Sequence, residues 1–171
     1  NRKLMVYDDV DDASMFRCIY TLMRIREADK KLGTKEPIEI LINSCGGTVY
    51  DGLSLISLIE NMKDDGYTII TTNMGYAFSM GFLISIVGSV RKSFRYATYL
   101  HHDMSSMNYG KLASMEEEIN DMRILRKRVD DIVLKYTKLT QADLDEINNK
   151  KLDKRFTAEE ALALKICDEV L

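Results

Sequence analysis

Short runs rich in branched apolar residues alternate with helical patterns along most of this chain, and this alternation limits the fold more than any other feature. The runs that read as strands are 3–10 (KLMVYDDV), 37–43 (PIEILIN), 67–74 (YTIITTNM) and 98–102 (TYLHH). Helical patterns cover 11–31, 50–65 and the segment that starts near Met80. Strands linked by helices usually lie parallel in one sheet with the helices packed on it. We therefore predict an α/β fold of parallel βαβ units.

The chain has 171 residues, and neither an internal repeat nor a low-complexity linker divides it, so we expect a single domain over 1–171. Its three cysteines are scattered and lack metal-ligand spacing, so we expect no disulfide framework, metal or cofactor. A formal net charge of −3 gives no reason to expect nucleic acid or an anionic membrane as partner. No secretory signal is recognised, and no apolar run is long enough to span a bilayer, so we expect a cytoplasmic protein.

A long helix is predicted over 112–136. Its apolar residues follow helical spacing of three and four, and Arg126 is the one polar residue in that stripe. The stripe is longer than the core of a chain this size easily covers. A stripe of this kind favours packing on a partner helix, although it could also lie along its own domain.

Ser79 is the first candidate for chemistry, in GYAFSMG (75–81) between a predicted strand and a predicted helix. Serine at a helix start is often only an N-cap, which is the more common role for such a residue. The same position favours a nucleophile, because unpaired N–H groups at the helix start stabilise negative charge. The glycines of SCGG (44–47) could likewise direct N–H groups at an oxyanion. The stretch lacks the GxSxG elbow of α/β-hydrolases, since position 77 is alanine.

A serine nucleophile needs a base, and the two histidines of the chain, His101 and His102, are adjacent at the end of a predicted strand. Side chains alternate along a strand, so only one of them is expected to face Ser79. The orienting carboxylate is harder to choose among 27 acids, and Asp153 reads first as a solvated loop residue. The residues alone thus reach a candidate serine hydrolase.

Four segments in order resemble the proteolytic subunit of the Clp protease (ClpP) and its phage and accessory relatives. The segment at 40–59 (ILINSCGGTVYDGLSLISLI) is similar to the family's INSPGGxVxxGxxI, and GYAFSMG is similar to its GxAASMG. ATYLHHDM (97–104) resembles the strand that ends in MIHQP, and 152–170 resembles the family segment that begins with an aspartate and continues as D-x-x-F. The resemblance covers nearly the whole chain. It implies a ClpP/crotonase-like fold with stacked parallel βαβ units and a long protruding handle helix at about 112–136.

The resemblance also assigns roles. It implies that Ser79 is the nucleophile, His102 the general base and Asp153 the residue that orients the imidazole. The backbone N–H groups of Gly47 and Met80 would then form the oxyanion hole. His102 rather than His101 fits the family spacing, because Ala97 lies five residues before it and Gly110 eight residues after it.

Partners follow from the same resemblance. The family forms rings, usually of seven subunits, and two rings stack through the handle helix, which would explain the stripe at 112–136. Substrates would be peptides or unfolded proteins, and an AAA+ unfoldase is a candidate partner. No metal or cofactor is implied.

Some residues depart from the family pattern. Cys45 replaces a proline, Phe78 replaces a small alanine, and Met104 replaces the proline after the histidine, so we expect an altered substrate cleft. Ile166 is aligned with a turn glycine. Two alternatives stay open: a crotonase-type acyl-CoA enzyme, which shares the fold, and a non-catalytic ring or assembly subunit.

Overall fold

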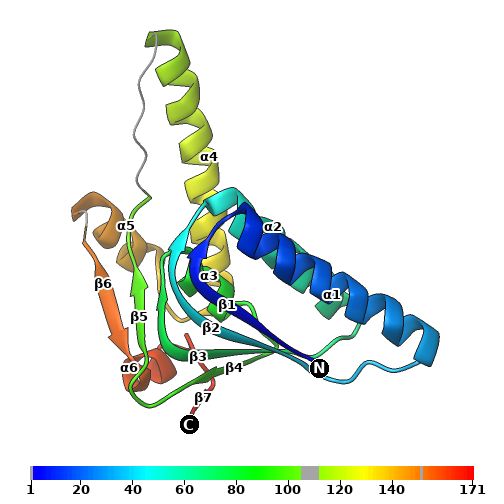
Figure 1. Ribbon diagram of the computed structural model, residues 1–171. Coiled ribbons are helices and arrows are strands. Elements are labelled where there is room, and N and C mark those ends of the chain that lie inside the picture. The colour runs from blue at the N-terminus through cyan, green and yellow to red at the C-terminus, as the bar shows by residue number, and fades with distance from the viewer. Residues whose placement is uncertain (1, 105–111, 151) are drawn as a thin grey trace.

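The computed structural model describes residues 2–104, 112–150 and 152–171 (Figure 1). The strands are β1 (Lys3–Val10), β2 (Ile38–Gly47), β3 (Ile69–Phe78), β4 (Val90–Ser93), β5 (Thr98–His101), β6 (Lys154–Thr157) and β7 (Glu169–Val170). The helices are α1 (Asp12–Leu32), α2 (Val49–Asp64), α3 (Met80–Ile86), α4 (Leu112–Tyr136), α5 (Gln141–Lys150) and α6 (Ala158–Ala163). The α/β class predicted from the sequence is confirmed.

Strand β3 is the branch point of the sheet. The main path runs β1-β2-β3-β4-β7, with every pair parallel. The first half of β3 pairs with β4, but its last residues, Tyr76 to Phe78, pair in parallel with β5 instead. β6 then adds to β5 as an antiparallel strand. The predicted parallel βαβ sheet is therefore present, with one antiparallel ribbon added.

Helices cover one face of the main path. Along β1, Leu4 and Val6 are buried while Met5 and Tyr7 are exposed, and β2 buries Ile38 and every second residue after it. α1 packs on β1, and α3 packs on β2 and β3. This alternation is the pattern of strands with a single covered face. Among the described residues, no helix is both long and apolar enough to span a membrane.

The handle helix predicted at 112–136 is present as α4 with the same bounds, and it projects away from the sheet (Figure 1). Its last half packs on the core through Leu125, Val129 and Val133. Further out, residues 116–120 are all exposed. The described stripe is thus covered only in part, as expected of a helix that is longer than its own core.

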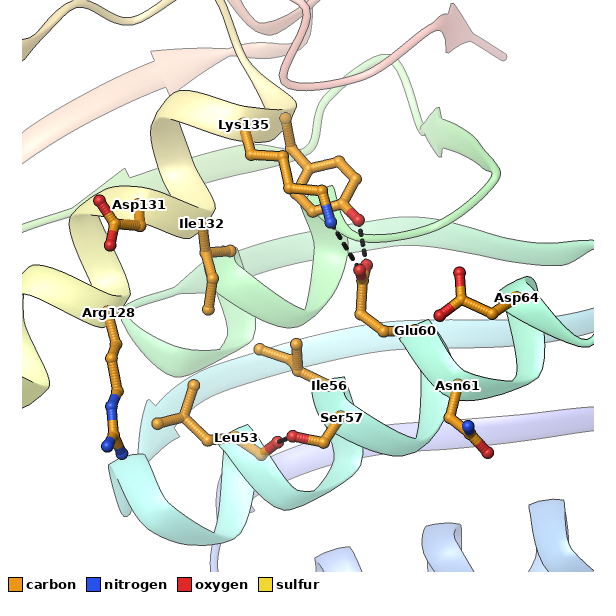
Figure 2. Close-up of a pocket in the computed structure, with 11 residues that line it drawn as sticks. Leu53, Ile56, Ser57, Glu60, Asn61, Asp64, Arg128, Asp131, Ile132 and Lys135 are labelled. Carbon is orange, nitrogen blue, oxygen red and sulfur yellow. Dashed lines mark hydrogen bonds and ion pairs between the residues drawn. The ribbon is translucent and has the colours of Figure 1, made fainter.

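The base of α4 is fastened to α2 by a cluster around Glu60 (Figure 2). The Glu60 carboxylate accepts a hydrogen bond from Lys135 at 2.7 Å, as Figure 2 shows. It also accepts from Lys63 at 3.2 Å and from the Tyr136 hydroxyl. These contacts join the last turn of α4 to α2, beside the apolar packing of Val129 and Val133.

Three local features differ from the sequence prediction. β4 and β6 were not predicted, because both are four residues long, contain several polar or charged residues and lack clear alternation. The left-handed residue of the turn after α6 is Lys165 (φ 56°), so the glycine-like position is Lys165 and not Ile166.

Candidate active site

The ends of three strands bring the candidate residues together. β3 and β5 are parallel, with Phe78 opposite Leu100, and the Ser79 N–H donates to the Leu100 carbonyl at 2.9 Å. Ser79 therefore reaches the same edge as the histidines that end β5. The carboxyl end of β2 lies beside them, since Ser44 pairs with Ala77. Parallel strands place their carboxyl ends at one edge, where active sites of α/β proteins usually lie.

Ser79 itself has a strained backbone, with φ 53° and ψ −117°. This is outside the regions that non-glycine residues normally occupy, and N-cap residues are normally extended. The Ser79 carbonyl accepts from the Leu83 N–H at 3.2 Å, as a residue at a helix start does, but its side chain makes no capping hydrogen bond. Such strain costs about 1–3 kcal/mol and is typical of functional turns, including the nucleophile elbow. The hydroxyl is thus not used as a cap.

Two glycines let the β2 turn approach this serine. A Cβ on Gly46 (φ 96°) would lie 2.6 Å from the Cβ of Ser79 and 2.9 Å from the Met80 nitrogen. A Cβ on Gly47 (φ 148°) would lie 2.2 Å from the carbonyl oxygen of Val10. Only glycine fits at either position, so the turn holds its backbone in contact with the start of α3.

A small pocket of about 90 Å³ lies where these elements meet. The candidates Gly47, Ser79, Met80 and His102 all line it, and so does His101. Its apolar wall is formed by Val49, Leu83, Met104 and Val129. The structure therefore brings four of the five residues assigned from the sequence to one cavity.

The two histidines have different surroundings. His101 is 3% exposed and packs against Phe82, with ring centroids 5.2 Å apart. Burial, and secondly the neighbouring His102, lowers the pKa of His101 to about 4, so its imidazole is neutral near pH 7. His102 follows the last residue of β5 and is half-buried at the pocket. Gly110, which was used to align the two histidines, lies outside the described residues.

The buried imidazole predicts a loss of stability in acid. The unfolded chain takes up this proton below about pH 6.5, whereas the folded protein does so only near pH 4. The free energy of unfolding therefore falls by up to about 3 kcal/mol as the pH is lowered from about 6.5 to 4. His101→Leu should remove this contribution. Urea denaturation of the unmutated protein and of His101→Leu at pH 7.5 and pH 4.5 tests this. An equal fall in the free energy of unfolding of the two proteins would contradict it.

Asp153 is the residue that the structure does not bring to the pocket. The register of β5 with β6 pairs His101 with Lys154, so its continuation by one residue sets Asp153 opposite His102. Yet the Asp153 side chain is 59% exposed and lies 3.7 Å from the Arg155 guanidinium. Among the described residues it makes no hydrogen bond to His102. Its backbone is suitably placed, but its carboxylate points elsewhere.

Asp103 is a pocket residue that the sequence did not single out. Of the described residues that line the pocket, only Asp103 carries a carboxylate. Its side chain lies 3.7 Å from the Arg126 guanidinium on α4 and accepts from the Met104 N–H. Its position directly after the histidine pair was the available signal. Arg126, the polar exception in the stripe, thus faces the end of β5.

The three departures from which an altered cleft was expected, Cys45, Phe78 and Met104, lie in different places. Met104 lines the pocket, whereas Phe78 does not and packs its ring against Tyr76, with centroids 5.3 Å apart. The expected change of the cleft therefore rests on Met104. Cys45 is exposed on the outer side of β2.

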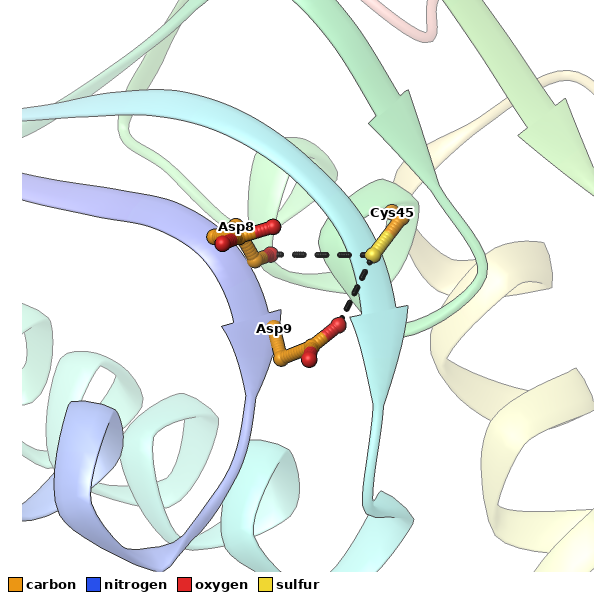
Figure 3. A group of neighbouring side chains, drawn as sticks. All are labelled: Asp8, Asp9 and Cys45. Carbon is orange, nitrogen blue, oxygen red and sulfur yellow. Dashed lines mark hydrogen bonds between the residues drawn. The ribbon is translucent and has the colours of Figure 1, made fainter.

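Cys45, Asp8 and Asp9 form the metal-like cluster seen in Figure 3. Their donor atoms lie within 4.8 Å of one another. The Cys45 thiol donates to Asp9 at 3.0 Å, and this hydrogen bond raises the pKa of the thiol. Metal binding requires a thiolate, so this arrangement favours the protonated thiol over a ligand.

A larger cavity lies away from this chemistry. It measures about 610 Å³ between α2 and α4, where Leu53, Ile56 and Ile132 face polar residues (Figure 2). Ser57 lines it, but its hydroxyl donates to the Leu53 carbonyl. Of the described residues that line it, none is a histidine or cysteine. The smaller pocket at Ser79 is therefore the candidate active site.

The fold is an α/β core with a projecting helix, and the pocket lies at the carboxyl ends of its parallel strands. The family model for Clp protease matches residues 1–171, and the chain belongs to that family. It is 26% identical over 172 residues to the ATP-dependent Clp protease proteolytic subunit 1 of Streptomyces avermitilis, covering 99% of this chain and 75% of that protein. It is also 26% identical to proteolytic subunit 3 of Rhodococcus jostii, covering 99% and 81%.

Proposed function

We propose that this chain is a serine endopeptidase subunit, one protease domain that cleaves peptides or unfolded proteins. Ser79 is the nucleophile, His102 the general base and Asp153 the residue that orients the imidazole. The N–H groups of Gly47 and Met80 bind the oxyanion. Family membership supports the broader class, a serine protease subunit of the Clp type.

The observation that carries this proposal is the conformation of Ser79. Its backbone is strained and its side chain makes no capping hydrogen bond, and the glycine turn and the histidine pair meet it at one pocket. A fold holds a residue in such a conformation when the surrounding contacts over-determine it. A serine hydroxyl that is kept free beside a histidine fits nucleophilic catalysis.

The reaction then follows the course of other serine peptidases. His102 takes the Ser79 proton as the oxygen attacks the peptide carbonyl, and later gives that proton to the departing amine. The Met80 N–H belongs to the first turn of α3, so it has no acceptor within the helix and is available to the developing negative charge. The Gly47 N–H approaches from the β2 turn. Water hydrolyses the acyl-enzyme with His102 as base.

The non-catalytic subunit is the second candidate, and one observation favours it. Asp153 faces solvent and Arg155 rather than His102, so the third member of the triad is not in its working position. A change of side-chain conformation at an exposed residue costs little, because the strand register already sets its backbone opposite His102. The crotonase-type alternative gains no such support. The described part of the pocket lining carries one serine and two histidines beside one carboxylate, that of Asp103.

Fluorophosphonate labelling followed by mass mapping separates these candidates. A peptidase should be modified at Ser79, and Ser79→Ala should not react. Ser85 is a control, because its hydroxyl is buried and donates to the Phe82 carbonyl. A folded protein that stays unlabelled would support the non-catalytic subunit or the acyl-CoA enzyme.

Ring assembly is part of the proposal. The exposed stripe of α4 supports a contact between subunits, and enclosure in a chamber of one or two heptameric rings would restrict substrates to peptides or unfolded chains. An AAA+ unfoldase is a candidate partner of such a ring. A cytoplasmic location fits this function.

Ile119→Glu tests the α4 contact. Ile119 is 47% exposed, so in an isolated subunit the change should cost little stability. In a contact between subunits the change buries like charges, and the assembly should break into smaller species. Sedimentation velocity at micromolar concentration is the measurement. Lys127→Glu, an exposed change away from the stripe, is the control. A monomer for the unmutated chain would contradict the ring.

A further inference from the structure

A buried hydroxyl lies directly behind the glycine turn at the candidate active site. Ser44, on β2, is 0% exposed and pairs with Ala77 of β3, two residues before Ser79. Its hydroxyl donates to the Asp8 carbonyl at 2.5 Å and accepts from the Gly46 N–H at 3.1 Å. A serine hydroxyl has one donor and two acceptor sites, so both hydrogen bonds can form at once. The Ser44 side chain therefore bridges the end of β1 and the glycine turn.

The end of β1 is shaped to present this acceptor. Asp8 has φ 67°, in the left-handed region, and the register of β1 with β2 shifts between Asp8 and Asp9. A shift of this kind is a β-bulge, which changes the direction of the groups around it. Beyond the bulge, the Thr48 N–H donates to the Val10 carbonyl at 2.7 Å. The two glycines of the turn thus lie between two attachments to β1, one before them and one after them.

The freedom of these glycines gives the attachments their importance. Gly46 and Gly47 have φ values of 96° and 148°, and glycine loses more conformational freedom on folding than any other residue. An oxyanion donor is effective only when it is held at about 2.7–3.1 Å from the position that the charged oxygen will occupy. Holding the Gly46 N–H restricts the peptide group that follows it, and the Gly47 N–H belongs to that group.

The start of α3 rests on the same serine. A Cβ on Gly81 would lie 2.9 Å from the Ser44 carbonyl oxygen and 3.2 Å from the Ser44 Cβ. Gly81 follows Met80, whose N–H is the other proposed oxyanion donor. Ser44 therefore contacts or holds both segments that carry the proposed donors.

We propose that Ser44 is a positioning residue of the oxyanion hole, whose hydroxyl holds the Gly46 N–H on β1 so that the Gly47 N–H is aligned before a substrate binds. This rests on the proposed function, because it assumes that an oxyanion forms at Ser79. Ser44 is not among the described residues that line the pocket, so it acts through the turn and not on the peptide. Its effect belongs to the transition state, in which the negative charge develops.

Ser44→Ala removes the hydroxyl and keeps the rest of the side chain. It should lower kcat for small fluorogenic peptides by about tenfold to a hundredfold, because loss of an oxyanion donor itself costs about 10²–10³. KM should stay within about twofold, since the peptide binds before the charge develops. Ser85→Ala is the control, because it also deletes a buried hydroxyl, one that donates to the Phe82 carbonyl, and it should keep kcat. An unchanged kcat in Ser44→Ala would overturn the role.

A peptide boronic acid gives a readout that a merely structural role would not move. It forms a tetrahedral adduct with Ser79 and so resembles the transition state, whereas a carboxamide of the same sequence binds without reacting. Ser44→Ala should weaken inhibition by the boronic acid by about tenfold and leave inhibition by the carboxamide unchanged. An equal loss for both inhibitors would show that Ser44 only supports the fold, and the role would be wrong.

Hydrogen exchange distinguishes failure of this role from failure of the proposed function. In the Ser79→Ala background, where no catalysis is needed, Ser44→Ala should speed exchange of the Gly46 amide by about tenfold, the effect of one lost hydrogen bond. If peptides are hydrolysed and Ser44→Ala changes neither kcat nor this exchange, only the role of Ser44 is wrong. If the unmutated protein hydrolyses no peptide, the proposed function is wrong. Exchange at Gly46 then still decides whether Ser44 holds the turn, and an unchanged rate overturns it.

Discussion

Ser79→Ala should abolish hydrolysis of small fluorogenic peptides and leave the fold intact. The change removes the attacking oxygen, and loss of a triad nucleophile lowers the rate by about 10⁴–10⁶. The methyl group of alanine fits where Ser79 now stands, so assembly should not change. Initial rates with purified protein are the measurement. Substantial remaining activity in a preparation free of other peptidases would rule out Ser79 as the nucleophile.

Ser79→Gly gives a matched comparison that separates catalysis from strain. Glycine occupies φ 53° and ψ −117° at little cost, whereas alanine keeps the strain of the serine. The glycine variant should be inactive, yet more stable than Ser79→Ala by about 1–2 kcal/mol in urea denaturation. A glycine variant that is less stable than the alanine variant would show that the turn is not strained.

His102→Ala should lower peptide hydrolysis by several orders of magnitude, while His101→Leu should stay active. The general base must be within about 3 Å of the Ser79 proton or reach it by a small closure. His102 is half-buried at the pocket, and His101 packs against Phe82 with its pKa near 4. Leucine can replace a neutral imidazole in such a site with little change in volume.

The pH dependence of kcat/KM separates the two histidines further. When the general base is removed, kcat/KM no longer falls in acid through protonation of that base. His101→Leu should therefore keep the acid limb of the profile. If His101→Leu is inactive and His102→Gln is active, the two roles are exchanged.

Long periodic segments were the part of the fold that the sequence predicted well. The α4 bounds, 112–136, match because its stripe repeats over many turns. The capping box of α6 was also visible, with Thr157 and Glu160 bonded to each other's backbone. β4 and β6 were missed because four residues with mixed polarity carry too little periodicity.

The candidate site was predicted less completely, for a different reason. Residue types indicated Ser79 and the histidine pair, and the family resemblance selected His102. The backbone angles of Ser79, however, depend on contacts with Gly46 from a distant strand. The direction of the Asp153 side chain depends on whether Arg155 or His102 attracts it, and both are neighbours in the same ribbon. Tertiary contacts decide such features, and one sequence does not display them.

The division of β3 between two partners has a consequence for how this protein opens. Its first half is held on both sides by β2 and β4, whereas its last residues depend on β5 and, through β5, on the short ribbon with β6. Subglobal opening of that ribbon would separate the histidines from Ser79 while the other pairings of the main path, β1-β2-β3-β4-β7, stay folded. The protein can therefore lose the geometry of its candidate active site in a local fluctuation that leaves most of its backbone protected.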